Sequence, residues 1–205
     1  TGHTNMVWGA LLLPEGRILS WSSEETLCLW NEQSGTLLAT LVGHTAGVSG
    51  ALQLTDGRIL SWSLDSTLRL WDGQSGILLP TLTGHTSFID GALELSDGCI
   101  LSWSADATLR LWDRQSGDPL ATLEGHTSAV NGARELSCGR ILSWSGDGTL
   151  RLWDRHTGAS PTILMGHIRS IWGALELANG RILSWSSEGT LRLWDRNSDG
   201  LLNNL

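Results

Sequence analysis

The stretch from Gly139 to Asp154, GRILSWSGDGTLRLWD, decides the fold of this chain. Residues 141–145 alternate in the manner of a β-strand. Gly146, Asp147 and Gly148 have the chemistry of a tight turn. Leu150, Leu152 and Trp153 belong to the returning strand. The stretch therefore predicts a β-hairpin.

The same hairpin occurs five times along the chain. A Gly-His dipeptide recurs every 41 residues, and five such steps account for all 205 residues. The chain is thus one block of five units: 1–41, 42–82, 83–123, 124–164 and 165–205. A fixed period near 40 residues indicates an array in which no unit buries its apolar face alone.

Each unit holds four strand-like runs. In the second unit they cover residues 48–54, 58–63, 67–72 and 77–82, and the breaks between them are rich in Gly, Asp and Ser. No segment shows a helical period. We therefore predict an all-β fold, a β-propeller made of four-stranded antiparallel blades.

Composition narrows the classes of partner. The formal net charge is −8 and there is no lysine, which argues against nucleic acid and against an anionic membrane surface. No apolar run approaches the ~18 residues that a membrane span needs. The three cysteines share no spacing pattern, so we expect thiols in a reducing compartment and a cytoplasmic location.

At this point the sequence resembles the WD40 family. The resemblance rests on the Gly-His opening, the serine-rich second strand, the turn acid and the Trp-Asp pair, in phase over the whole chain. Four units carry Trp-Asp, whereas the first has Trp30-Asn31. The chain is also similar to highly repetitive bacterial WD40 arrays, which are often the sensor portion of signalling ATPases or kinases.

The resemblance implies a hydrogen-bonded structural tetrad of His, Ser, Asp and Trp in each blade. Which of two alternate serines takes part stays open, and Glu24 and Glu188 at the acid position make the geometry doubtful in both terminal units. Carried over, the tetrads of units 2 to 4 are His44, Ser61, Asp65 and Trp71; His85, Ser102, Asp106 and Trp112; and His126, Ser143, Asp147 and Trp153.

Ser, His and Asp are also the residue types of a hydrolase triad. Here they recur in at least three units, each set with a Trp, and no G-x-S-x-G elbow is present. We therefore predict a structural role and no enzyme activity. Five histidines placed one per blade cannot converge on one ion at ~2 Å, so we predict neither a metal site nor a cofactor.

Function is expected where the units diverge. Three positions per unit vary in kind, and in similar proteins they open onto one face of the ring. Exposed aromatic side chains beside polar groups build binding hot spots, although drift between copies is an alternative. The predicted binding residues are Met6, Trp8, Leu64, Phe88, Asp90, Asn131, Arg169 and Trp172. The excess acidic charge lies in units 1 to 3 and would favour a basic peptide, or would merely aid solubility.

Ring closure is the open question. Five blades in one ring require about 72° each, whereas an unclosed arc exposes two apolar blade faces. We therefore predict self-association into a homodimeric ring of roughly eight to ten blades; a closed five-bladed monomer and higher assemblies are the alternatives.

Three functions follow from this reading. The first is a non-catalytic scaffold for a peptide or protein, or a sensor-domain fragment. The second is a recently amplified or engineered propeller block whose main property is self-assembly. The third is a propeller that binds a small molecule or sugar, in which Trp8 and Trp172 would stack on the ligand.

Overall fold

The computed structural model describes residues 2–154, 161–195 and 200–204. It contains five four-stranded antiparallel sheets, and in each sheet the strands follow one another in sequence order. A single short 3-10 turn, η1 (Pro14–Gly16), interrupts the strands of the described residues. The predicted all-β fold of four-stranded blades is confirmed.

Each sheet is one blade, and its strands come from one 41-residue unit, except that in three blades the fourth strand runs one residue into the next unit. Blade 1 contains β1 (Val7–Leu13), β2 (Arg17–Ser22), β3 (Thr26–Asn31) and β4 (Leu37–Val42). Blade 2 contains β5 (Val48–Gln53), β6 (Ile59–Ser63), β7 (Thr67–Trp71) and β8 (Leu78–Thr83). Blade 3 contains β9 (Ile89–Glu94), β10 (Ile100–Ser104), β11 (Leu109–Trp112) and β12 (Pro119–Leu123). Blade 4 contains β13 (Val130–Glu135), β14 (Ile141–Ser145), β15 (Thr149–Trp153) and β16 (Thr162–Met165). Blade 5 contains β17 (Ile171–Glu176), β18 (Ile182–Ser186), β19 (Leu191–Trp194) and β20 (Leu201–Asn204).

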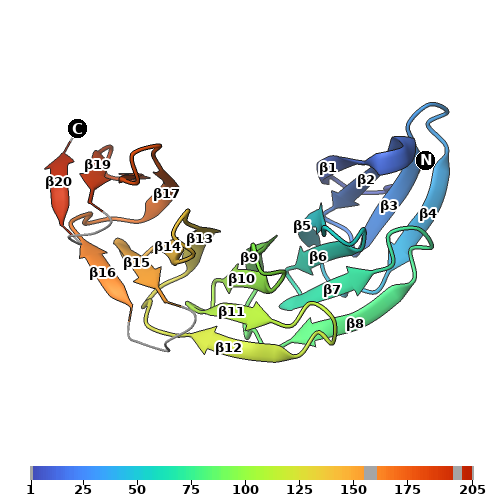
Figure 1. Cartoon of the computed structure of the whole chain (residues 1–205). Coiled ribbons are helices and arrows are strands. Elements are labelled where there is room, and N and C mark those ends of the chain that lie inside the picture. Colours follow the sequence, from blue (N-terminus) through green and yellow to red (C-terminus); the bar gives the residue numbers. More distant parts are fainter. Residues whose placement is uncertain (1, 155–160, 196–199, 205) are drawn as a thin grey trace.

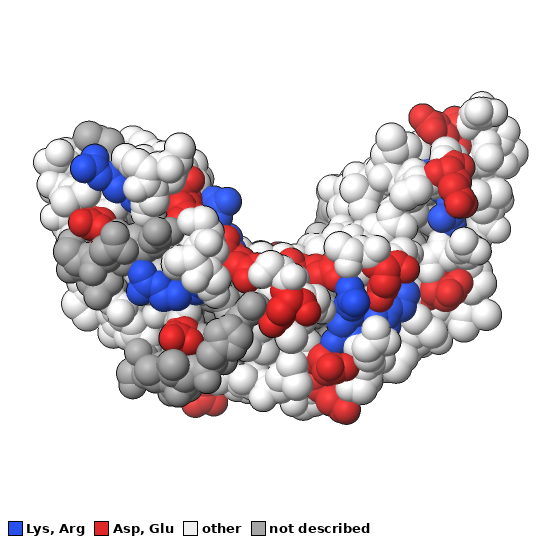
Figure 2. Space-filling model, in the orientation of Figure 1, with Lys and Arg blue, Asp and Glu red and all other residues white. Residues whose placement is uncertain are grey.

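The five blades form an open arc (Figure 1). The first strands of the blades line its concave edge and the fourth strands its convex edge. Packing between blades joins each blade to the next one along the chain. Blades 1 and 5 stand at opposite ends of the arc, and the surface is U-shaped (Figure 2). The chain therefore does not adopt the closed five-bladed ring, which was one of the alternatives that the sequence allowed.

Each pair of neighbouring blades buries one apolar core. Between blades 1 and 2, five leucines of blade 1 pack against four apolar side chains of blade 2. The same nine positions build the core between blades 2 and 3 and the core between blades 4 and 5. Eight of them recur between blades 3 and 4, with Leu123 packed alongside. The residues of the first core are Leu13, Leu19, Leu27, Leu29 and Leu41 with Val48, Ala51, Ile59 and Trp71.

These cores define two faces for every blade. We call the leucine side of a blade its trailing face, because it contacts the next blade along the chain. The side with Val or Ile, Ala, Ile and Trp is the leading face, because it contacts the preceding blade. Burial of about 25 cal/mol per Å² of apolar surface at these contacts is the main force that holds the arc together.

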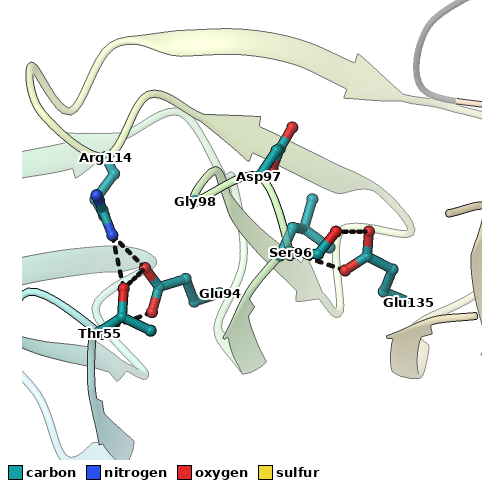
Figure 3. A pocket seen from close by; sticks show the side chains of 8 residues that line it. Thr55, Glu94, Ser96, Asp97, Gly98, Arg114 and Glu135 are labelled. Atoms are coloured by element: carbon teal, nitrogen blue, oxygen red, sulfur yellow. Dashed lines mark hydrogen bonds and ion pairs between the residues drawn. The ribbon is translucent and has the colours of Figure 1, made fainter. Parts of the chain in front are cut away.

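Hydrogen-bonded polar pairs also join neighbouring blades at one edge of these apolar cores. The backbone N–H and the hydroxyl of Thr55 donate to Glu94 of the next blade, both at 2.8 Å. Ser96 donates in the same way to Glu135 (Figure 3). Arg114 adds hydrogen bonds to Thr55 and Glu94. These groups line a hollow of about 550 Å³ between the blades.

Candidate interaction face

The antiparallel strand order gives the arc two rims. We call the lower rim the edge that holds the turns between the first and second strands, such as residues 55–57, and between the third and fourth strands, such as residues 72–76. The upper rim holds the loop before each first strand and the turn between the second and third strands, such as residues 43–47 and 64–66. The polar pairs of Figure 3 lie on the lower rim, and the predicted binding residues lie on the upper rim.

The tetrad side chains of blade 4 form one hydrogen-bonded chain. Trp153 Nε1 donates to Ser143 Oγ at 2.8 Å, Ser143 Oγ lies 2.8 Å from His126 Nε2, and His126 Nδ1 lies 2.8 Å from Asp147 Oδ2. Blades 2 and 3 repeat this arrangement with distances of 2.8–2.9 Å. The first serine of each Ser-Trp-Ser triplet is therefore the one that joins the chain.

The direction of the protons follows from burial. Desolvation lowers the pKa of His126 and of the equivalent His85, although an aspartate beside each ring opposes this. A neutral imidazole then donates from Nδ1 to the carboxylate and accepts the serine proton at Nε2. The serine oxygen in turn accepts the indole N–H, so each of these four side chains has a hydrogen-bond partner within the tetrad.

The aspartates of these tetrads remain ionised. Burial alone would raise the pKa of Asp147, but hydrogen bonds from Thr149, the backbone of Thr127 and His126 outweigh it and lower the pKa to about 2. The pKa of Asp65 is also lowered, because hydrogen bonds from His44 and Thr67 outweigh the opposing effect of its burial. Each aspartate thus ties the loop before the first strand to the turn before the third.

The terminal blades form tetrads as well, contrary to the doubt raised by their glutamates. In blade 1, Glu24 Oε1 lies 2.6 Å from His3 Nδ1, and Ser20 Oγ bridges His3 and Trp30 at 2.7 and 2.8 Å. The hydrogen bond from Thr4, with others from His3 and Thr26, lowers the pKa of Glu24 to about 2.

Blade 5 repeats this solution. Glu188 Oε1 lies 2.7 Å from His167 Nδ1, and hydrogen bonds from Thr190 and His167 lower the pKa of Glu188 to about 2. The extra methylene of glutamate is therefore absorbed by the turn in both terminal blades.

The upper-rim positions that vary between units lie close together. Backbone N–H groups of the turn donate to carbonyls of the loop before the first strand: Ser23 to Met6, Leu64 to Gly47 and Ala105 to Phe88. These three bonds are 2.8, 3.0 and 3.1 Å long. The variable positions of one blade thus form a single patch of surface.

Neighbouring patches also touch. Asn131 Nδ2 of blade 4 donates to Ser170 Oγ and to the Ile171 carbonyl of blade 5. A Cβ on Gly47 of blade 2 would lie 3.0 Å from the Trp8 ring of blade 1, so the indole already fills that space. At these two contacts the second residue of a first strand therefore meets the loop of the next blade, and the patches follow one another in a row along the upper rim.

The row carries exposed apolar groups and one unusual carboxyl. Trp8, Phe88 and Leu64 are 43–45% exposed. Asp90 lies at the surface with its inner side against protein, and this desolvation raises its pKa to about 6. Asn131 is exposed beside it on the next first strand.

The two ends of the row are far apart. Met6 and Trp8 belong to blade 1, whereas the exposed Arg169 and Trp172 belong to blade 5 at the other end of the arc (Figure 1). Trp8 and Trp172 therefore cannot stack on one small ligand within one chain. The middle of the row, on blades 2 to 4, brings Leu64, Phe88, Asp90 and Asn131 onto one rim.

Sequence reasoning missed the lower-rim pairs. The sequence does contain a pattern that indicates these pairs: in three units, a Ser or Thr in the turn after the first strand is followed 39 residues later by a Glu of the next unit. The pairs become visible only when each unit is read against the next one, rather than against its aligned equivalent.

The described ranges hold no group of three or more His, Cys, Asp and Glu side chains that could bind a metal ion. Within the same ranges, no helix is long and apolar enough to cross a membrane.

Five repeated four-stranded blades with a buried His-Ser-Trp chain define the class of WD-repeat β-propellers. Two segments of the sequence, 35–72 and 117–154, match the family model described as WD domain, G-beta repeat. The chain thus contains WD40 repeats, and its five four-stranded antiparallel sheets are consistent with a WD40 propeller. No curated protein sequence matches it.

Proposed function

We propose that this chain is a non-catalytic interaction scaffold that binds a peptide or a protein segment along its upper rim. WD40 repeats support a role in protein interaction in general. The observation that carries the finer proposal is the row of exposed Trp8, Leu64 and Phe88 at positions that differ from blade to blade. A residue type that only maintained the fold would be expected to repeat with the frame around it.

The polar groups of the row favour a partner with a basic side chain. Asp90 is an exposed carboxyl on the same rim as Phe88 and Asn131, and desolvation raises its pKa to about 6. An arginine or lysine of a partner beside an apolar side chain would match this surface. The acidic excess on blades 1 to 3 acts in the same direction.

The buried tetrads support the absence of catalysis. The tetrad serines Ser61, Ser102 and Ser143 are 0% exposed, and the oxygen of each already accepts an indole N–H. A nucleophilic serine must instead meet its substrate. We expect a fluorophosphonate probe, which labels activated serines, to leave the chain unmodified; stoichiometric labelling would contradict the proposal.

A peptide selection tests the binding proposal directly. Peptides are selected from a random display library against the whole chain and then measured against two variants. Phe88→Ala removes an exposed side chain of the row, and we expect at least a tenfold loss of affinity, the usual scale of a hot-spot residue. Leu120→Ala is the control, because Leu120 is equally an exposed apolar side chain, 55% exposed, but lies on the convex edge in β12. Selected peptides that bind both variants equally well would contradict the proposal.

Self-assembly is a second candidate function, and a different observation favours it. The arc ends in two apolar blade faces that no neighbouring blade of the same chain covers. A ring completed by a second copy, of roughly eight to ten blades, would bury both.

We also infer a reducing, cytoplasmic location. Cys28 is a fully buried thiol at a position where the other units carry arginine, and burial raises its pKa. An odd number of cysteines without a common spacing is unusual for a disulfide-stabilised protein.

A further inference from the structure

The two ends of the arc are the two halves of a contact that the chain builds four times internally. The leading face of blade 1 carries Val7, Ala10, Ile18 and Trp30. Val7 is 52% exposed, whereas its four equivalents are completely buried. The trailing face of blade 5 carries Leu177, Leu183, Leu191 and Leu193. Leu191 is 42% exposed, and its four equivalents are again completely buried.

We propose that the trailing face of blade 5 packs on the leading face of blade 1 of a second copy of this chain, head to tail, in the register of the internal contacts. The proposal rests on self-assembly as the second candidate function and names the surfaces and the residue pairs that mediate it. It is independent of peptide binding by the middle of the upper rim.

The lower rim supplies the first evidence that these two faces match each other. At three internal contacts a hydroxyl of the first turn donates to a glutamate of the next blade. The corresponding positions at the two free ends are Ala178 on blade 5 and Leu12 on blade 1. The hydroxyl and the carboxylate are therefore lost together, and an apolar side chain stands opposite another.

The contact between blades 1 and 2 shows that such joint changes occur within the chain. There Pro14 replaces the hydroxyl residue, and Gln53 replaces the glutamate and donates to the Gly57 carbonyl of its own blade instead. Three internal pairs thus contain both the hydroxyl and the carboxylate, and the fourth contains neither of these two groups. A contact between Ala178 and Leu12 would follow the same pattern.

The upper rim supplies the second evidence. The second residue of a first strand meets the loop of the next blade where Trp8 meets Gly47 and where Asn131 meets Ser170. At the free ends the corresponding pair is Trp172 on blade 5 and Met6 on blade 1. These are 65% and 68% exposed, and a thioether against an aromatic ring is a favourable contact.

These pairs favour a second copy over an ordinary further blade. A blade with the usual glutamate would find no hydroxyl on Ala178, and a blade with the usual serine would face the 64% exposed Leu12. Both ends depart from the repeat in a complementary way. The proposed contact joins a trailing face to a leading face, and each copy has one free face of each kind. Two arcs can therefore form this contact twice and close a ring of ten blades.

The mass of the chain in solution tests the contact. Light scattering coupled to size exclusion should give two chains, 2 × 22.2 = 44.4 kDa, rather than one. Leu191→Glu charges the trailing face of blade 5 and Val7→Glu the leading face of blade 1, and each alone should give 22.2 kDa. Leu120→Glu is the matched control on the convex edge and should keep the mass of the unchanged chain. Circular dichroism confirms that each variant is folded.

Mixing the two variants tests the head-to-tail arrangement. The Leu191→Glu chain keeps an intact leading face and the Val7→Glu chain an intact trailing face, so the mixture should associate although neither variant does alone. If only one variant lost association, a face would pair with itself and the proposal would be wrong. A 22.2 kDa mass for the unchanged chain would also overturn it.

A double substitution tests the register. Leu12→Glu places a carboxylate opposite Ala178 and should weaken association. Adding Ala178→Ser rebuilds the pair found at the other contacts and should restore affinity by about tenfold, the effect of one hydrogen bond to a charged group. Equal affinities of the single and double variants would exclude this register.

Peptide binding separates the two proposals. A Leu191→Glu monomer that still binds the selected peptides shows that association, and not the upper rim, was disrupted. Loss of peptide binding in Phe88→Ala at unchanged mass shows the reverse.

Discussion

At the scale of single residues, each blade depends on one buried polar chain. Trp, Ser, His and an acid are joined at 2.6–2.9 Å in all five blades. A buried polar network stabilises a fold only when every member has a partner, because an unpaired group retains its full desolvation cost. This explains why the acid can change between Asp and Glu, whereas His, Ser and Trp do not change.

Removing the central member should therefore be costly. Ser143→Ala leaves Trp153 Nε1–H and His126 Nε2 without partners in a buried site, and we expect a loss of about 2–5 kcal/mol in the free energy of unfolding. Urea unfolding followed by tryptophan fluorescence measures it. Ser128→Ala, on the exposed loop before β13, is the matched control and should change stability by less than about 0.5 kcal/mol. Equal effects of the two substitutions would show that the network contributes nothing.

The tetrads also predict how stability depends on pH. Burial lowers the pKa of His85, His126 and His167 below the ordinary value of 6.5, so the unfolded chain binds more protons below that pH. Stability should be constant from pH 8 to about 7 and should fall as the pH drops through about 6.5. Asp147 and Glu188, each lowered to about 2 from 3.8 and 4.5, add a second loss below about pH 4.5. Thermal midpoints at each pH measure both steps, and a midpoint that rose on acidification would contradict this assignment.

At the scale of the element, the glycine of each first strand is required by a close approach. A Cβ on Gly132 would lie 2.2 Å from Cζ2 of Trp144 on the adjacent strand β14, and the four equivalent glycines meet their own Trp at 2.1–2.4 Å. The indole thus lies flat over the backbone of the neighbouring strand. The close contact of this glycine is therefore with a tryptophan of its own blade.

This contact predicts an unusual response to substitution. Gly→Ala in a strand normally favours folding through the unfolded chain, yet Gly132→Ala should destabilise by about 1–3 kcal/mol through overpacking. Trp144→Leu in the same chain should recover part of that loss, because the smaller side chain leaves room for the methyl group. Urea unfolding of the two single variants and the double variant measures the coupling. Strictly additive losses would show that the indole is not the obstacle.

The elements were predictable because the chain contains five versions of one design. Comparing the units placed both ends of the four strands of the second unit to within one residue and separated constant positions from variable ones. The comparison could not reveal that Glu24 would reach His3, since the turn geometry that absorbs the extra methylene is not written in residue types. It also could not pair Ser96 with Glu135 or Trp8 with Gly47, because these contacts join different units and depend on the register between blades.

At the scale of the whole molecule, the sequence left open whether five blades close a ring. The angle between blades is set by how five leucines of one face fit four side chains of the next, which residue types do not determine. The structure resolves this as an open arc, in which four contacts of one kind are satisfied and the fifth is divided between the two ends.

The division predicts that one substitution will have different effects at two equivalent sites. Leu101 and Leu183 occupy the same position in blades 3 and 5, but Leu101 is completely buried between blades and Leu183 lies on the free trailing face. Leu101→Ala should cost about 2–5 kcal/mol at any protein concentration, because its contact is within the chain. Leu183→Ala should cost less in dilute solution and more as the concentration rises, because association buries this site and stabilises the folded chain by mass action. Thermal midpoints of both variants over a hundredfold range of concentration measure this, and a concentration-independent gap between them would mean that nothing covers the end of the arc.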